Sequence, residues 1–172
     1  KAIANYIDTM VIKPDILLLQ EVDVSSKRSA YVNQLQWLLN NTHFKYGVFA
    51  SMWETEIIPQ AGLGRINTGN AILSRWEITD AERIKLDLRN DQDALTQYFY
   101  LRRNILKAKI LLPIAEDFYV VDIHATAFAK DNTKQKHIDK YKAVLDGLNQ
   151  PGTIFVSGGD LNSIPIPTEN DS

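Results

Sequence analysis

Three short apolar runs constrain the fold, because each of them stops abruptly at polar residues that can carry chemistry. The runs and the polar residues that follow them are Leu17–Leu19 with Gln20 and Glu21, Tyr119–Ile123 with His124, and Thr153–Val156 with Asp160 and Asn162. Apolar runs of this length are typical of strands buried on both faces. If these strands lie side by side, their carboxyl ends bring the polar side chains to one rim, where a rigid scaffold favours a preorganised site.

The polar residues at these strand ends suit a site for a hard metal ion. Mg²⁺ commonly takes one or two carboxylates and keeps water at its other positions. Each residue alone has an ordinary alternative: Glu21 begins a solvated loop, and His124 is a surface or capping residue. Asp160 and Asn162 follow two glycines, which permit either a tight turn that aims both side chains or an Asx-type turn without chemistry. The combination favours a metal-assisted hydrolase.

The remaining pattern mixes helices and strands without a repeat or a linker. Apolar spacing predicts helices over residues 2–12, over a segment capped by Ser29, and over residues 133–149. The second helix places Tyr31, Leu35, Leu38 and Leu39 on one face. Strands are expected at residues 44–51, from Asn70 onwards, over residues 97–112 and, as a last buried strand, from Thr153, with long connections at residues 51–69 and after residue 162. This order favours a mixed α/β sandwich that forms a single domain over residues 1–172.

Composition excludes several classes of protein. The chain has 172 residues, no cysteine and a formal net charge of −2. The absence of cysteine excludes disulfides, thiolate zinc sites and cysteine nucleophiles. No apolar run approaches the roughly 20 residues of a membrane span, and no signal peptide is visible at the start. A soluble protein is expected, either cytoplasmic or exported with its signal removed.

Five segments occur in an order that resembles the endonuclease/exonuclease/phosphatase superfamily of deoxyribonuclease-like, Mg²⁺-dependent phosphoesterases. They are PDILLLQEV (residues 14–22), GNAILSR (69–75), the two arginines before NILKAKI (102–110), VVDIHA (120–125) and SGGDLNSIP (157–165). The resemblance covers about residues 3–165. It implies a two-sheet β-sandwich flanked by helices, in the four-layer deoxyribonuclease-like arrangement, with one phosphoesterase site at the sheet edges.

The resemblance also implies a role for each matching residue. Glu21 would be a ligand of Mg²⁺, for which Mn²⁺ can substitute. Asp160 would orient or deprotonate the attacking water, and Asn162 would hydrogen-bond a phosphate oxygen. His124 would contact the scissile phosphate. The substrate phosphate would also meet Arg103 and Asn70, and this division of labour agrees with phosphoryl transfer, which depends on positioning and charge neutralisation.

The sequence departs from the family pattern in three places. The family begins with a strand that carries a metal-binding Asn, and it ends with a Ser-Asp-His motif; neither is present between Lys1 and Ser172. The family His is usually followed by Leu, whereas Ala125 follows His124 here. We therefore expect a partial catalytic domain, incomplete at both ends, that lacks part of the catalytic site and is not active by itself. His137 lies in a lysine-rich helix and is expected to be exposed.

The phosphoester itself is left open among nucleic acid, a phospholipid head group and a sugar phosphate. A duplex nuclease would be expected to carry more positive charge, and the lysines of residues 130–142 fit the solvated side of a helix. In the connection at residues 51–69, Met52, Trp53, Ile57 and Ile58 either meet a lipid or fill the core, and Arg65 is a free cation. The alternative function is a binding or scaffold protein that keeps the fold without catalysis. No protein partner is predicted.

Overall fold

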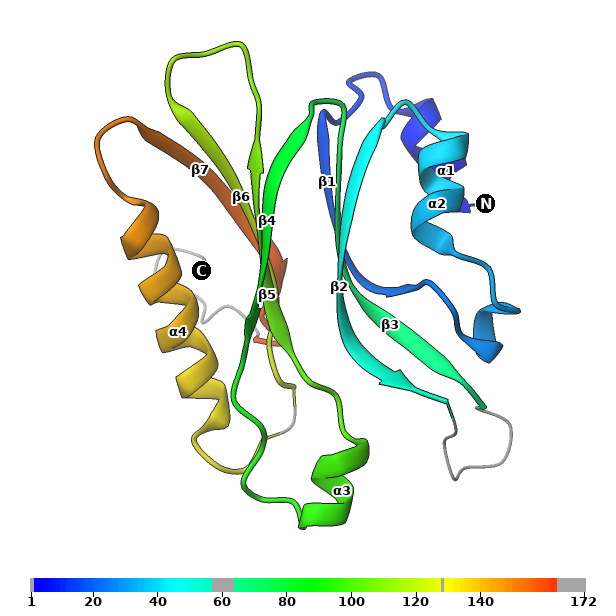
Figure 1. Cartoon of the computed structure of the whole chain (residues 1–172), viewed down its shortest axis with the longest axis vertical. Helices are drawn as coiled ribbons and strands as arrows, with labels where there is room; N and C mark the ends of the chain where they lie inside the picture. The colour runs from blue at the N-terminus through cyan, green and yellow to red at the C-terminus, as the bar shows by residue number, and fades with distance from the viewer. Residues whose placement is uncertain (1, 57–63, 128, 164–172) are drawn as a thin grey trace, which may run out of the picture.

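Two β-sheets face each other in a computed structural model that describes residues 2–56, 64–127 and 129–163 (Figure 1). The first sheet has the order β1-β3-β2, and the second has the order β4-β5-β6-β7. The strands are β1 (Ile16–Asp23), β2 (Tyr46–Thr55), β3 (Ile66–Ser74), β4 (Ile78–Lys85), β5 (Asn104–Ile110), β6 (Asp117–His124) and β7 (Thr153–Asp160). The predicted two-sheet sandwich flanked by helices is therefore confirmed.

Helices lie on the outer faces of both sheets and at one end of the molecule. They are α1 (Ala2–Thr9), α2 (Gln34–Asn41), α3 (Ala94–Phe99) and α4 (Thr133–Leu148), with a short 3₁₀ turn, η1 (Lys27–Ser29). The helices α1 and α2 lie on the first sheet and α4 lies on the second, whereas α3 lies at the lower end of the molecule in Figure 1. None of the helices in the described ranges is both long and apolar enough to cross a membrane.

The core has one apolar layer between the sheets and one beneath the helices on each side. In β1, Leu18 packs between the sheets, whereas Leu17 and Leu19 pack towards α1 and α2. The strand is thus covered on both faces, which is why its sequence is a continuous apolar run. In β6, Val120 faces the first sheet, and Ile123 belongs to the layer packed against α4.

The second sheet brings two of the predicted strand ends together. Strands β5 and β6 are antiparallel, but β6 and β7 are parallel and are joined by α4. Their register pairs His124 with Asp160 at the carboxyl ends. Strand β1 belongs to the other sheet, so its end meets them across the sandwich and not within one sheet.

Two predicted helix and strand boundaries are wrong. Asn33 is the N-cap of α2, where its side chain accepts a hydrogen bond from the backbone N–H of Gln36. Ser29 instead ends η1, and Tyr31 has a left-handed backbone with φ 61° and is exposed. The predicted strand over residues 97–112 begins only at Asn104, because its first part belongs to α3.

Three further expectations need correction. The connection at residues 51–69 is shorter than predicted, because β2 continues to Thr55 and β3 begins at Ile66. Strand β7 lies at the edge of its sheet, and Ile154 and Val156 are exposed. His137 is buried, where its Nε2 lies 2.8 Å from the carbonyl of Asp87. Ile57, Ile58 and the segment after Ser163 lie outside the described residues.

Candidate active site

A bulge in β1 places Glu21 at the edge of the first sheet. Leu19 pairs with Ala71 of β3 and Val22 pairs with Gly69, so Gln20 and Glu21 share the single partner position of Asn70. Bulges re-aim side chains and bend the strand that carries them. Glu21 has a left-handed backbone with φ 58°, and its side chain is exposed.

Across the sandwich, His124 and Asp160 lie at the ends of β6 and β7. The His124 Nε2 atom is 3.6 Å from the Asp160 Oδ2 atom. The imidazole is almost fully buried, whereas 48% of the Asp160 side chain is exposed. The backbone N–H of Ala125 donates to the carbonyl of Asp160 at 2.8 Å, which holds the two strand ends together.

Gly159 makes this approach possible. Its φ is 130°, a conformation that L side chains rarely adopt. A Cβ atom added there would lie 2.1 Å from the carbonyl oxygen of Ile123. The second glycine of the pair is therefore required for the end of β7 to lie against β6, and it lies within the strand and not in the tight turn expected at the two glycines.

Asn162 is fixed beside Asp160 by three hydrogen bonds. Its backbone N–H donates to Asp160 Oδ1 at 2.8 Å, which is an Asx-type turn. Its Nδ2 donates to the carbonyl of Ala125 at 2.8 Å, and its carbonyl accepts from the Lys134 ammonium group. Lys134 is thus not simply part of a solvated face. The Asx-type turn, one of the two expected alternatives, is therefore present.

Arg103 contributes a buried cation from the start of β5. Only 7% of the residue is exposed, and its Nε and Nη1 atoms have no hydrogen-bond partner among the described residues. Burial lowers its pKa, and the negative charges of Glu21 and Asp160 oppose that shift. Because an arginine stays protonated in proteins, this guanidinium is a fixed positive charge with unused donors.

The His124 imidazole lies in the field of the same groups. Burial lowers its pKa and the positive charge of Arg103 lowers it further, whereas Asp160 and Glu21 act in the opposite direction. The net shift is downward, so the ring is neutral at pH 7 and its contact with Asp160 is not an ion pair. Its Nδ1 atom is buried without a partner among the described residues.

Two polar contacts that the sequence did not reveal join the sheets behind these groups. Asn70 Nδ2 donates to both the carbonyl and the Oδ1 of Asn104 at 3.2 Å. Gln20 Nε2 donates to Asp122 Oδ1 at 2.6 Å. The only sequence signal for these contacts was a polar residue at the start of an apolar strand, Asn104 in NILKAKI, and one inside an apolar strand, Asp122 in VVDIH.

The predicted residues therefore separate into a group that lies together at the candidate site and a group that does not. Glu21, Arg103, His124 and Asp160 influence one another electrostatically, and Asn162 is bonded to Asp160. Asn70 is wholly buried, and its Oδ1 atom has no partner within the described part of the chain. In contrast, Arg65 is not a free cation, because it pairs with Glu56 at 3.4 Å, and Met52 is a core residue of β2.

The sequence from residue 1 to residue 171 matches the model of the Endonuclease/Exonuclease/phosphatase family. The chain belongs to this family. A search of curated protein sequences gives no match.

Solved structures share the fold of this family member at low sequence identity. An endonuclease/exonuclease/phosphatase from Beutenbergia cavernae DSM 12333 is 20% identical with a TM-score of 0.70, over 98% of this chain and 43% of that one. Sphingomyelinase C from Streptomyces griseocarneus is 18% identical with a TM-score of 0.61, over 93% and 56%. The 2′,3′-cyclic phosphatase ANGEL2 is 17% identical with a TM-score of 0.60, over 95% and 42%. The chain thus spans about half the length of these structures or less.

Proposed function

We propose that this family member is a divalent-metal-dependent phosphoester hydrolase. The observation that supports this most directly is the buried Arg103 guanidinium, whose Nε and Nη1 have no hydrogen-bond partner among the described residues and which lies within electrostatic range of His124 and Asp160. A buried cation needs an anion to compensate its desolvation, and the planar guanidinium fork suits phosphate oxygens. The family match and the phosphoesterases among the similar structures agree with this assignment.

In the proposed reaction, water attacks phosphorus, the ester P–O bond breaks, and the leaving oxygen takes a proton from bulk water. The exposed Asp160 carboxylate orients the water and takes its proton. The backbone N–H of Asn162 holds its Oδ1 atom, and its Oδ2 atom lies towards His124, so the carboxylate is fixed beside the proposed phosphate contact. The neutral His124 ring donates a hydrogen bond to a phosphate oxygen, and Arg103 neutralises the charge that develops there. Asn162 adds its remaining amide hydrogen. Asn70 is wholly buried, so we assign it the role of holding Asn104 and the start of β5.

Glu21 is the proposed ligand of Mg²⁺ or Mn²⁺. Mg²⁺ needs as few as one or two carboxylates because it retains several waters, and the exposed Glu21 carboxylate meets that minimum. The unpartnered Asn70 Oδ1, on the residue opposite the bulge, is an oxygen of the type that hard cations accept. When bound, the ion would supply Lewis-acid stabilisation of the phosphate charge.

One observation favours the alternative of a binding protein without catalysis. Among the described residues, no three His, Asp or Glu side chains are grouped closely enough to enclose a metal ion. A module of this kind would bind a phosphate group through Arg103 without hydrolysing it. The two functions therefore differ in turnover and not in the binding of an anion.

The test is the rate of the intact protein on a panel of phosphomonoesters and phosphodiesters in the presence of Mg²⁺. Replacing the proposed base by Asp160→Asn should lower kcat/KM by about 100-fold or more, the usual range for loss of acid–base catalysis. The matched control is Asp139→Asn, which changes an exposed carboxylate on α4 and should have no effect. A rate within a few fold of the wild type for Asp160→Asn would refute the assignment, and no turnover of any ester by the wild type would favour the binding module.

A further inference from the structure

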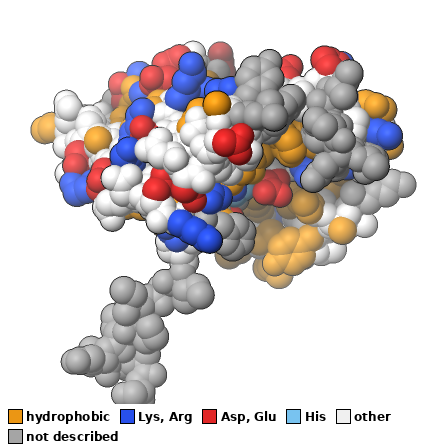
Figure 2. All heavy atoms as spheres, turned by 90° about the horizontal axis from the view of Figure 1, so that it is seen from below, with side chains coloured by type: hydrophobic (Ala, Val, Ile, Leu, Met, Phe, Trp, Pro, Cys, Tyr) orange, Lys and Arg blue, Asp and Glu red, His pale blue; other side chains and the backbone are white. Residues whose placement is uncertain are grey.

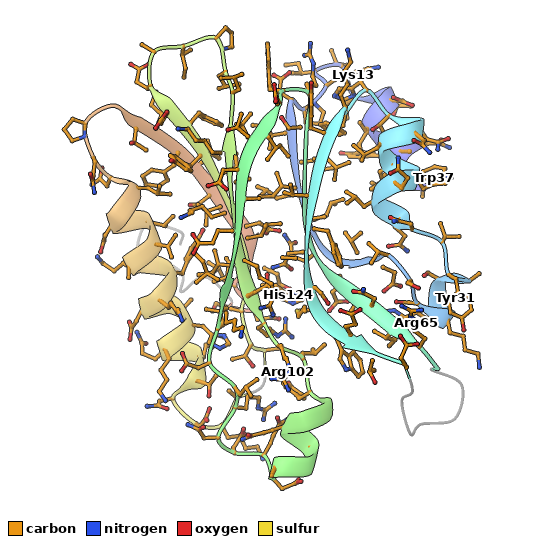
Figure 3. All side chains as sticks on the ribbon, in the orientation of Figure 1. Lys13, Tyr31, Trp37, Arg65, Arg102 and His124 are labelled. Atoms are coloured by element: carbon orange, nitrogen blue, oxygen red, sulfur yellow. The ribbon has the colours of Figure 1, made fainter. Side chains whose placement is uncertain are left out.

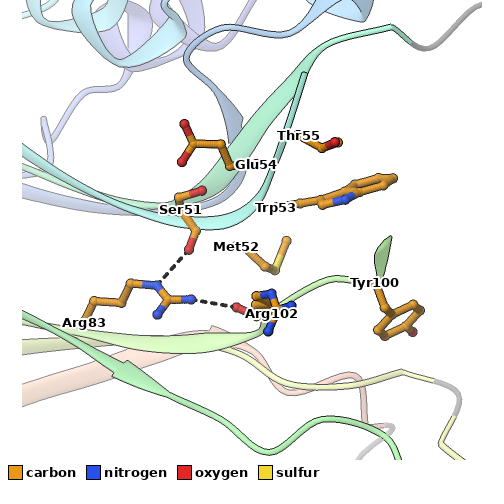
Figure 4. A pocket seen from close by; sticks show the side chains of 8 residues that line it. All are labelled: Ser51, Met52, Trp53, Glu54, Thr55, Arg83, Tyr100 and Arg102. Atoms are coloured by element: carbon orange, nitrogen blue, oxygen red, sulfur yellow. Dashed lines mark hydrogen bonds between the residues drawn. The ribbon is translucent and has the colours of Figure 1, made fainter. Parts of the chain in front are cut away.

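A cavity of about 360 Å³ lies beside the candidate active site, between the end of β2 and the second sheet (Figure 4). It is lined by residues 51–55 of β2, by Arg83 of β4, and by Tyr100 and Arg102 from the segment before β5. The proposed chemistry uses none of these side chains. The segment is fixed to β2 by the backbone N–H of Arg102, which donates to the carbonyl of Met52 at 2.6 Å.

Two guanidinium groups meet in this cavity. Arg83 is held in place, because its Nε donates to the carbonyl of Ser51 at 2.8 Å and its Nη2 donates to the carbonyl of Arg102 at 3.1 Å. The Arg102 side chain is exposed and has no hydrogen bond or ion pair among the described residues. Glu54 also lines the cavity but is exposed and forms no ion pair with either arginine in the described ranges. The described lining of the cavity therefore carries two positive charges against one carboxylate, which leaves a net positive charge.

The electrostatics of Arg83 agree with this description. Burial lowers its pKa, and the neighbouring charge of Arg102 lowers it further. An anion placed between the two guanidiniums would remove this repulsion, whereas a neutral ligand would not.

Hydrogen bonds link the cavity to the inter-sheet contact behind the candidate active site. The Ser51 carbonyl that accepts from Arg83 also accepts from Asn104 Nδ2 at 3.2 Å, and Asn104 in turn holds Asn70. Arg102 directly precedes Arg103, and consecutive Cα atoms are about 3.8 Å apart. Figure 3 shows Arg102 and His124 in the same lower part of the sandwich. Tyr100, which lines the cavity, also lies within electrostatic range of the Arg103 guanidinium, which places the cavity next to the proposed contact with the scissile phosphate.

Two aromatic rings extend the cavity on one side. In Figure 4, Trp53 and Tyr100 lie at the opposite end of the view from Arg83, with Arg102 between them. The Trp53 Nε1 donor is buried and has no partner in the described part of the chain. Tyr100 is fixed by Arg89, whose Nη1 donates to the phenol oxygen at 3.3 Å. The rings offer flat surfaces next to the charged groups.

We propose that this cavity is a second anion subsite, which receives a phosphate group of the substrate other than the one that is hydrolysed. The inference rests on the proposed function, because the scissile phosphate is assigned to Arg103 and His124. Guanidinium groups bind phosphate through two parallel hydrogen bonds. The preferred substrate therefore carries two phosphates, and the shared chemistry fits either a nucleotide bisphosphate or a sugar bisphosphate.

Binding of paired ligands tests the subsite without requiring turnover. Calorimetry on the intact Asp160→Asn protein with Mg²⁺ compares adenosine 3′,5′-bisphosphate with adenosine monophosphate, and glucose 1,6-bisphosphate with glucose 6-phosphate. At least one of the two bisphosphates should bind about tenfold more tightly than its monophosphate. Preference in the nucleotide pair alone identifies a nucleotide, which would use the aromatic rings, and preference in the sugar pair alone identifies a sugar phosphate.

Variants of Arg102 decide whether the preference arises in this cavity. Arg102→Gln should reduce the tenfold preference to within about twofold, and Arg102→Lys should restore part of it, which also shows that the site folds. The matched control is Arg75→Gln, which removes an exposed arginine after the end of β3. No bisphosphate preference in either pair, or a preference that survives in Arg102→Gln, overturns the subsite.

The subsite and the proposed function fail in different ways. A protein that binds bisphosphates through Arg102 but hydrolyses no phosphoester would refute the hydrolase and keep the subsite. A protein that loses turnover in Asp160→Asn, but whose ligand preference is independent of Arg102, would refute only the subsite.

Discussion

Replacement of Asp122 by Asn should stabilise the protein at neutral and alkaline pH. Asp122 lies near the carboxyl end of β6, is wholly buried, and accepts a side-chain hydrogen bond from Gln20 of the facing sheet. Its Oδ2 atom has no partner among the described residues, and burial raises the pKa of the carboxyl to about 7. Asn is nearly the same size and offers Gln20 the same oxygen acceptor, but it has no charge to bury.

The size and sign of the effect follow from proton linkage. The unfolded carboxyl has a pKa near 3.8 and the folded one about 7. Between these values the folded state keeps a proton that the unfolded state has lost, so wild-type stability falls as the pH rises. At 1.36 kcal/mol per pH unit, the whole interval corresponds to about 4 kcal/mol. Below pH 4 the stability that the wild type gains from its protonated, neutral Asp122 is fully present, and above pH 7 it is lost.

Urea unfolding of the wild type and of Asp122→Asn, at pH values from 4 to 8, measures this quantity. The difference in the free energy of unfolding should grow in favour of the variant up to about pH 7 and then remain constant. Burial lowers the pKa of both His124 and His137, which makes stability rise with pH, but these groups are present in both proteins and largely cancel in the difference. A difference that is the same at pH 5 and pH 8 would refute a buried carboxyl that titrates near neutrality.

Two further outcomes are expected at the site itself. Gly159→Ala should destabilise the end of β7 and reduce activity by at least tenfold, because a Cβ would collide with the carbonyl of Ile123 at a φ of 130°. Circular dichroism melts and kcat/KM measure the two effects, and wild-type values would contradict the argument from this close approach. Glu21→Ala should abolish saturable Mn²⁺ binding in calorimetry, whereas Glu116→Ala, at an exposed carboxylate before β6, should retain it. Equal binding by both variants would remove Glu21 from the metal site.

The residues at the ends of apolar runs were predictable from the sequence. His124 and Asp160 end strands that the sequence marks as apolar, although only β6 is buried, and their side-by-side register follows from a parallel pair joined by α4. The two-sheet sandwich was also predictable from the order of the strands together with the resemblance. In these places the local pattern and the tertiary structure agree, because burial on two faces leaves little choice of residue.

The contacts between the sheets were not predictable, because they depend on which strands face each other. Nothing in the local sequence indicates that Asn104 meets Asn70 across the sandwich. The bulge, which places two residues of β1 opposite one residue of β3 within the first sheet, is equally invisible in the sequence. His137 was expected on an exposed face because it lies among lysines, yet it accepts from the backbone N–H of Thr126. Such partners become visible only when distant segments are placed together.

The surface at the site end bears on the choice of substrate. Figure 2 views the molecule from this end, and the described basic and acidic side chains are interspersed on it. A protein that holds long stretches of duplex needs a continuous row of cations to neutralise successive phosphates. Under the proposed function, the interspersed charges of the described residues on this face agree with a small phosphoester more than with a long polyanion.

The division of the site between two sheets has a mechanical consequence. The candidate metal ligand belongs to one sheet, whereas the groups that would touch water and phosphate belong to the other, and the hydrogen bonds Asn70–Asn104 and Gln20–Asp122 fix their alignment. A slip of one sheet over the other would separate the two halves without unfolding either. Under the proposed function, the hydrolysis rate therefore depends on how the two sheets are aligned. A substitution far from the rim that shifts the packing between the sheets should lower the rate before it lowers the stability of the fold.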